Sequence, residues 1–500
     1  MQRRKFLQTL APAIVLPSLL QGLTIRAYSA TPFIQELSAL QTDTDRVLVL
    51  IQLNGGNDGL NTVIPLDQYE NLQAARGNVL ATEDSVLPLS GTTATGLHPA
   101  MEGMRQLYEE GKLSIIQGVG YPNFSFSHFR ATDIYATGSS GIENLETGWI
   151  GRYLEHEFNG FPAGFPNPEM PDPPAIQLGL GIPLLFQAAA TNMAMTISGP
   201  NVFNNWVNGG GSGLPSTPAG IELAYLRTIA QQTQSYASQI IAASEAVTSQ
   251  NPNYPEAGVN ELSDQLKLVA RLIAGGLKTR IYLVSIGGFD THSNQIGGGS
   301  SNTGTHATLL GKVSDAIKAF TDDLTFLNIE DRVLGMTFTE FGRRVKANAS
   351  AGTDHGTCYP MFVFGTNLQP GMVGVNPVIP ASVGVNFNLP TQHDYRAVYG
   401  TLLKDWFCLP QTIANDIMLH NFTALPIVNA PCCISPQPVI TGPVTVCPEN
   451  IAVYSIPEIA GSTYIWTVTG GTILSGQGTN TIQVQWENNQ AGNVQVSQIQ

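Results

Sequence analysis

Residues 280–294 read Arg-Ile-Tyr-Leu-Val-Ser-Ile-Gly-Gly-Phe-Asp-Thr-His-Ser-Asn, and this stretch decides the fold class. Ile281 to Ser285 is a run of β-prone residues, which predicts a buried strand. Two glycines follow, and after them come Asp290 and His292, whose side chains can bind metal. Because open α/β sheets place their chemistry at the carboxyl ends of strands, the stretch predicts such a sheet with a polar site at this end.

A second stretch has the same organisation. Val333 to Phe338 predicts another buried strand, and the loop after it contains Gly352-Thr353-Asp354-His355-Gly356. Asp290 and His292 in one loop and Asp354 and His355 in the other form two Asp/His pairs. We therefore expect one polar centre assembled from segments that are distant along the chain.

The first predicted strand, residues 46–53, is a near-continuous apolar run, as expected of a central strand buried on both faces. A glycine-rich turn, residues 54–61, follows it and contains Asp58. Glycines at a strand end let the backbone approach a ligand closely. Taken alone, however, this turn favours an ordinary loop with a solvated Asp58 over a ligand site.

The strand predicted at residues 113–119 leads into a loop with candidate catalytic groups. Ser127 beside His128 and Arg130 is a candidate nucleophile with cationic neighbours, and Ser125 is a second candidate serine. An equally good alternative is that these hydroxyls cap the helix predicted at residues 129–135. The residues alone leave both interpretations open.

Residues 159–218 are rich in Gly, Pro and Asn and interrupt the α/β rhythm. We expect an insertion whose short strands, 175–178 and 193–197, form a cap over the site. Apolar periodicity predicts further helices at residues 99–112, 221–249, 260–277, 306–327 and 392–406. In the last of these, Asp394 has the position of a helix-starting acid.

The two ends of the chain differ from its centre. Arg3-Arg4-Lys5-Phe6-Leu7 before an apolar segment, residues 10–20, predicts an export signal over residues 1–30 that resembles a twin-arginine signal; an ordinary secretory signal or a short membrane anchor is the alternative. No later stretch is long enough for a transmembrane helix. Residues 31–430 form the predicted α/β domain, and the alternating pattern of residues 431–500 predicts a small β-sandwich that ends within a strand.

Composition limits the partners. Hydrophobic residues make up 43% of the 500 residues and charged residues 12%, which is typical of a globular chain. The net charge of −14 repels phosphate backbones, so we expect no nucleic-acid partner, and an anionic substrate would need a local cation such as bound metal. Five cysteines are present, and pairing of Cys447 with Cys432 or Cys433 is expected for an exported chain, with the connectivity open.

The motifs occur together in a recognisable order. Residues 53–61, Ser127-His128-Phe129, residues 288–292, residues 339–343 and residues 352–356 resemble, in register, the exported family catalogued as domain of unknown function 1501. That family is similar to the alkaline phosphatase and sulfatase superfamily. The resemblance implies a doubly wound α/β core and a hydrolytic centre with one or two divalent metals, for which zinc, calcium and magnesium are all open.

The resemblance also assigns roles to residues. Asp58 matches a metal ligand after the first strand, Ser127 matches the nucleophile, and Asp290, His292, Asp354 and His355 match further ligands. The pattern departs from that of the phosphatases in the tight Asp-Thr-His spacing and in a late histidine for which His393 is the candidate. Arg130 or Arg343 would hold the anionic oxygens of the substrate.

Two functions follow from these expectations. The first is an exported, metal-dependent hydrolase that acts on a small phosphate or sulfate ester, including esters of glycans. The second is a non-catalytic surface or carbohydrate-binding protein that keeps the hydrolase fold. Residues 464–468 and 470–479 resemble PKD-like modules of secreted bacterial proteins, which implies a cell-surface or secretion-machinery partner for the C-terminal segment.

Overall fold

The computed structural model describes residues 44–179, 181–197, 235–430 and 432, together with 440–443, 446, 450–458, 463–486 and 492–499. The chain divides into two compact units, with a boundary in the sequence after Cys432, and each is described by itself below. The predicted export signal and residues 198–218 of the predicted insertion lie outside the described residues.

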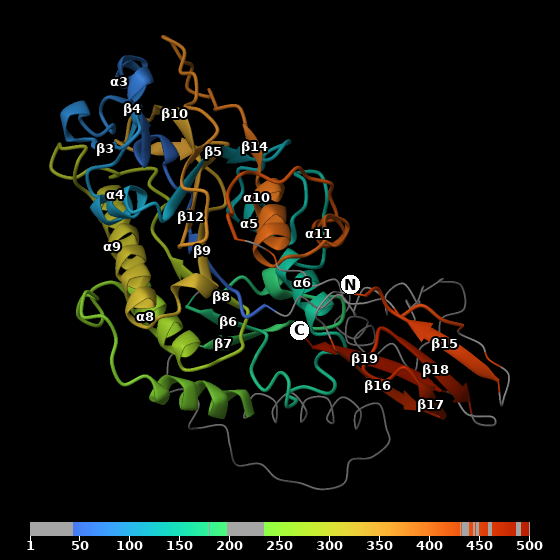
Figure 1. Cartoon of the computed structure of the whole chain (residues 1–500). Helices are drawn as coiled ribbons and strands as arrows, with labels where there is room; N and C mark the ends of the chain where they lie inside the picture. The colour runs from blue at the N-terminus through green and yellow to red at the C-terminus, as the bar shows by residue number, and fades with distance from the viewer. Residues whose placement is uncertain are drawn as a thin grey trace, which may run out of the picture. The chain divides into compact units, whose positions relative to one another are not determined.

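A mixed sheet forms the centre of the larger unit (Figure 1). In the described part of the chain the strand order is β13-β5-β12-β9-β1-β8-β6-β7, with β14 beside β5. The strands are β1 (Val47–Leu53), β5 (Leu113–Gly120), β6 (Ala175–Leu178), β7 (Ala194–Ile197), β8 (Ile281–Ile286), β9 (Val333–Phe338), β12 (Tyr359–Phe364), β13 (Gly371–Val373) and β14 (His393–Asp394).

The middle of this sheet is parallel. β1 pairs in parallel with β8 on one side and with β9 on the other, whereas β12 runs antiparallel to both β9 and β5. Every residue of β1, β8 and β9 is buried, which explains their uninterrupted apolar runs. The carboxyl ends of three neighbouring strands therefore lie side by side at one edge of the sheet.

Helices cover both faces of the sheet, as predicted for a doubly wound core (Figure 1). Val47, Val49 and Ile51 of β1 pack with one helical layer, and Trp406 of the other layer donates its indole N–H to the Val47 carbonyl at 3.1 Å. The first layer contains α4 (Glu102–Glu109), α8 (Glu261–Ala274) and α9 (Thr305–Phe326). The second contains α5 (His128–Thr137), α6 (Trp149–Glu157), α10 (Tyr395–Thr401), the π-helical turn Leu402–Trp406 and α11 (Gln411–Met418).

The smaller elements border the carboxyl edge of the sheet. β2, β4 and β3 form a three-stranded sheet, and β10 and β11 form a hairpin. These elements and a short helix are β2 (Val63–Pro65), α3 (Tyr69–Arg76), β3 (Leu87–Leu89), β4 (Thr92–Leu97), β10 (Arg343–Ala347) and β11 (Thr353–His355). Short 3-10 helices cover Gly59–Asn61, Leu66–Gln68, Glu83–Ser85, Pro183–Phe186 and Glu330–Arg332.

The structure corrects two expectations about this unit and confirms a third. β6 and β7 extend the central sheet in parallel with β8, so these two short strands do not form a separate cap. Cys432 pairs with Cys408, with the two Cα atoms 5.5 Å apart, so the expected pair of Cys432 with Cys447 does not form; the alternative, Cys433 with Cys447, lies outside the described residues. Asp394 caps α10, as predicted, by accepting the Arg396 backbone N–H at 2.9 Å.

The smaller unit is built from antiparallel strands, as the alternating pattern predicts. β15 (Ile451–Ser455), β18 (Thr481–Trp486) and β17 (Gly471–Ser475) form one sheet, and β16 (Thr463–Thr469) and β19 (Asn493–Ile499) form another. Side chains from both sheets, including Tyr454, Trp466 and Val484, share one apolar core.

Candidate metal centre

The loops after β1 and β8 approach each other closely at the carboxyl edge. Gly55 has a φ of +124°, and a Cβ atom there would lie 2.3 Å from the backbone nitrogen of Asp290. Only glycine fits both the backbone conformation and the contact. The glycine-rich turn therefore serves to bring the Asp290 loop against the end of the first strand.

The β10–β11 hairpin brings the second Asp/His pair to the same place. Arg343 of β10 pairs with His355 of β11. The Thr353 backbone N–H donates to the Thr291 carbonyl at 3.1 Å, so the hairpin is hydrogen-bonded to the β8 loop. Side chains that lie far apart in the sequence are thus gathered in one site.

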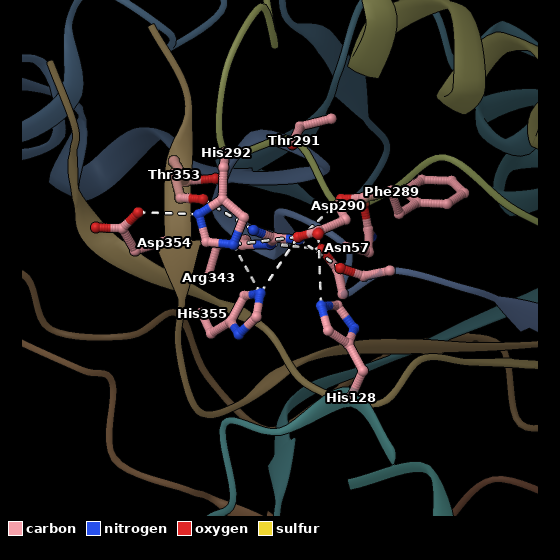
Figure 2. Close-up of polar contacts among 12 residues, drawn as sticks. Asn57, His128, Phe289, Asp290, Thr291, His292, Arg343, Thr353, Asp354 and His355 are labelled. Atoms are coloured by element: carbon pink, nitrogen blue, oxygen red, sulfur yellow. Dashed lines mark hydrogen bonds and ion pairs between the residues drawn. The ribbon is translucent and has the colours of Figure 1, made fainter. Parts of the chain in front are cut away.

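Three imidazole rings converge on the carboxylate of Asp290 (Figure 2). The Nε2 atoms of His292 and His355 both lie 3.2 Å from Oδ1, and the Nε2 atom of His128 lies 3.4 Å from Oδ2. The Nε2 atoms of His292 and His355 are 2.8 Å apart. We call His128, Asp290, His292 and His355 the His/Asp centre.

The opposite nitrogen of each ring is held by an oxygen acceptor. His128 Nδ1 lies 3.0 Å from Glu340 Oε1, His292 Nδ1 lies 3.0 Å from Asp354 Oδ1, and His355 Nδ1 lies 2.8 Å from the Phe126 carbonyl. With its proton on Nδ1, toward these oxygens, each neutral ring leaves its Nε2 lone pair available to bind a cation beside Asp290. Metal-binding histidines are held in this way.

The donor set fits a divalent transition metal. Facing lone pairs on His292 and His355 repel each other unless a proton or a cation lies between them. Donor atoms of His128, Asp290 and His355 all lie within 4.8 Å of one another, close enough to share an ion. Imidazole nitrogens with one carboxylate suit zinc, whereas calcium and magnesium prefer oxygen ligands.

The charges around the centre favour an ionised Asp290. Burial alone would raise the pKa of Asp290, but the hydrogen bond and the charge of Arg343 hold it below its usual value. The hydrogen bond to Glu340 raises the pKa of His128, whereas partial burial lowers the pKa of His355. The pKa values of His128 and His355 are thus shifted in opposite directions although both rings contact one carboxylate.

The two arginines expected to hold substrate are engaged elsewhere. Arg343 is buried, and its guanidinium donates to Asp290 and to the carbonyls of Gly55, Gly56, Phe289 and Thr353. Arg130 donates to the carbonyls of Ser140 and Glu143. Both side chains hold loops together through these bonds.

Asp58 lies in a different environment from the expected one. Its carboxylate forms an ion pair with Arg76 at 2.7 Å, and both side chains are 0% exposed. Gln295 Nε2 donates to the other carboxylate oxygen at 2.6 Å. Because these partners satisfy Asp58, we leave it out of the proposed ligand set.

The remaining predicted site residues have distinct positions. His393 belongs to β14 and pairs with Val119, with its Nε2 beside Gly374, so we do not include it among the ligands. Asp354 contacts the Nδ1 atom of His292, on the ring side opposite Asp290, and so orients this ring. Ser127 is the exposed N-cap residue of α5 and makes no capping hydrogen bond through its side chain.

Sequence reasoning did not single out Glu340 as a site residue. His128 was among the expected catalytic residues, and in the structure its ring lies with the proposed ligands and its Nδ1 atom contacts Glu340. Glu340 is buried and also accepts the Gly55 backbone N–H at 2.8 Å. The signal that could have found it was its position directly after β9, at the same sheet edge as Asp290.

The centre opens to solvent. The side chains of Asp290 and His292 are 45% and 43% exposed. A small cavity of about 20 Å³ lies elsewhere, lined by Gly59, Cys358 and other residues, and includes no member of the centre. The His/Asp centre therefore lies at an open surface of the described structure.

Fold and site together define a mixed α/β protein with a His/Asp centre at the carboxyl edge of its sheet. The chain belongs to the family described as protein of unknown function DUF1501, which matches residues 117–379. A PKD-like domain matches residues 434–499. No curated protein matches the chain.

Several solved structures are similar to this chain at low sequence identity. A protein in the alkaline phosphatase superfamily from Vibrio parahaemolyticus has 11% identity over 68% of this chain and 70% of its own, with a TM-score of 0.31. Lipoteichoic acid synthase LtaP from Listeria monocytogenes has 7% identity over 85% and 88%, with a TM-score of 0.27. Alkaline phosphatase from the Antarctic bacterium TAB5 has 10% identity over 64% and 91%, also with a TM-score of 0.27. Likeness of this size carries no argument for a shared activity.

Proposed function

We propose that this chain is a metal-dependent hydrolase of phosphate or sulfate esters, with one divalent cation held by His128, Asp290, His292 and His355. The observation that supports it is the convergence of three Nε2 atoms on Asp290 while each Nδ1 is held by an oxygen. The substrate class rests on the family resemblance of the motifs described in the sequence analysis.

The exposure of the centre supports catalysis over a purely structural metal. Structural zinc sites are closed by protein ligands, whereas catalytic sites keep a position for water or substrate. Asp290 is 45% exposed and His128 is 36% exposed, so the ligands remain open on one side. An ester could approach from that side without rearrangement of the fold.

Ser127 is the proposed nucleophile. Its hydroxyl makes no capping bond, whereas the Ser125 hydroxyl accepts the Ser127 backbone N–H at 3.3 Å. Ser127 also directly precedes His128, a proposed ligand. These facts favour Ser127 over Ser125.

The chain's own groups would divide the work as follows. A bound divalent cation would supply Lewis-acid polarisation of the ester. Ser127 Oγ would bond to phosphorus or sulfur as the bond to the ester oxygen breaks, and the serine proton would pass to the departing oxygen to give the alcohol. Water would then break the bond between Oγ and phosphorus or sulfur, returning one proton to the serine and releasing the anion. N–H groups in the first turn of α5 have no intrahelical partners and would stabilise the negative charge.

We assign recognition of the substrate's negative charge to Arg344. Its Nη1 atom lies 3.9 Å from Asp354 Oδ2, a loose ion pair at the border of the centre. Its side chain is 25% exposed, whereas that of Arg343 is fully buried. An anionic oxygen could therefore compete for Arg344 but not for Arg343.

Metal analysis of natively purified, dialysed protein tests the first half of the proposal, and turnover of aryl phosphate and aryl sulfate esters tests the second. We expect about one divalent ion per chain and its loss in His355→Ala. Ser127→Ala should abolish turnover and keep the metal, whereas the matched variant Ser125→Ala should keep both. Unchanged turnover in Ser127→Ala and His355→Ala would refute the proposal.

A second function, binding at the cell surface without catalysis, is favoured by the PKD-like domain at residues 434–499. A chain that holds metal and turns over neither ester would support it. We also propose that the chain is exported, since the Cys408–Cys432 disulfide suits an oxidising compartment. Within the described ranges no helix combines the length and apolarity needed to cross a membrane.

A further inference from the structure

A buried amide lies between the loops that carry the His/Asp centre. Gln295 is 1% exposed. Its Oε1 atom accepts hydrogen bonds from the hydroxyls of Thr291 at 3.1 Å and Thr353 at 2.9 Å. We propose that Gln295 is a positioning residue that fixes the spacing of the two ligand-bearing loops, an inference that rests on the proposed metal centre.

We call Gln295, Thr291 and Thr353 the clamp, and the two threonines lie next to the proposed ligands. Thr291 stands between Asp290 and His292, and Thr353 directly precedes Asp354 and His355. The two loops therefore meet on a single oxygen atom, and the Thr353 N–H bond to the Thr291 carbonyl reinforces the contact. A change in either hydroxyl would alter how the Asp290 loop faces the His355 hairpin.

Asp58 and Arg76 set the orientation of the amide. An ionised Asp58 only accepts hydrogen bonds, so the NH₂ group of Gln295 must face it, at 2.6 Å, and Oε1 must face the threonines. Arg76 holds Asp58 at 2.7 Å and donates to the carbonyls of Val345 and Arg344 in β10. Asp58 and Arg76 thus connect the clamp to strand β10 of the hairpin.

Isosteric variants test each arm of the clamp. Thr291→Val and Thr353→Val each remove one hydroxyl, and Gln295→Met removes the shared acceptor. Thr279→Val is the matched control, because Thr279 is also fully buried, donates to the Pro173 carbonyl at 2.8 Å and lies just before β8 rather than after it. Loss of the Thr279 hydroxyl should lower stability without changing metal binding.

The measurement is the affinity of the metal-free full chain for Co²⁺, followed by visible absorption, with thermal unfolding of each metal-free variant to confirm folding. We expect the two clamp threonine variants and Gln295→Met to bind Co²⁺ about 10- to 100-fold more weakly, the usual effect of lost orienting contacts. Thr279→Val should bind like the wild type. Thr291→Ser and Thr353→Ser, which keep the hydroxyl, should restore affinity.

The outcomes separate this inference from the function on which it rests. Wild-type affinity in folded Thr291→Val, Thr353→Val and Gln295→Met would overturn the clamp and leave the metal centre intact. An equal loss in Thr279→Val would also overturn it, because the effect would then follow general stability. A wild-type chain that binds no Co²⁺ would overturn both proposals.

Discussion

Asp58→Asn distinguishes an anchoring carboxylate from a metal ligand. In the structure Asp58 and Arg76 form a fully buried ion pair, and Arg76 makes its other hydrogen bonds to backbone carbonyls. The amide keeps the size and one acceptor of the carboxylate but removes its charge. Arg76 is then a buried cation without a counter-charge.

The expected loss in free energy of unfolding is about 3–5 kcal/mol at pH 7, the usual cost of removing one partner of a buried pair. Burial raises the pKa of Asp58, but the charge of Arg76 and the hydrogen bonds from Arg76 and Gln295 act together with other nearby groups to hold the pKa below the ordinary value of 3.8. A depressed pKa contributes stability above the unfolded value, and that stability is lost as the pH falls through the folded value. The difference between wild type and variant should therefore shrink in acid.

Urea unfolding in excess EDTA measures the loss with metal removed. Arg76→Met should cost a similar amount, and the double variant should cost less than the sum of the two single changes, because each leaves the other partner uncompensated. If metal-free Asp58→Asn is as stable as the wild type and a difference emerges only when metal is added, Asp58 is a ligand and our assignment is wrong.

Three further predictions concern stability. Burial raises the pKa of Glu157 from 4.5 to about 7, so the stability of the wild type is unaffected by this group below pH 4.5 and falls as the pH rises through 7. In urea unfolding, Glu157→Gln should have the same free energy of unfolding as the wild type at pH 4 and one about 3 kcal/mol higher at pH 8. Gly55→Ala, whose Cβ would meet a backbone nitrogen at 2.3 Å, should cost about 3 kcal/mol or more, against about 1 kcal/mol for Gly276→Ala, which has positive φ but open space; equal costs in thermal unfolding would contradict the close approach. Replacing Cys408 and Cys432 by Ser should lower stability by about 3 kcal/mol in oxidising buffer and by nothing under full reduction.

The sequence predicted the central sheet because its strands are buried on both faces. The runs in β1, β8 and β9 are uninterrupted and end in polar loops, so both the strands and the edge that carries the site could be predicted. β6 and β7 are only four residues long and stand in a Gly/Pro-rich segment. Their place beside β8 depends on long-range pairing, which periodicity does not contain.

Residue types at the site were easier to predict than their roles. The Asp290, His292 and His355 side chains lie together, since Asp290 and His292 follow β8 and the hairpin with His355 follows β9 in the chain. The partner of Asp58 is Arg76 of α3. No local sequence pattern indicates that an arginine of this helix contacts the loop after β1. Which oxygen faces which ring nitrogen is likewise a property of the tertiary structure.

The disulfide between Cys408 and Cys432 closes the main unit just before the C-terminal module begins. If that module tethers the protein to a surface, a pulling force along the chain would pass from Cys432 across the covalent bridge to Cys408. The intervening segment, which includes α11, would bear none of that tension. The arrangement would let the tether be strained without unravelling the end of the α/β unit.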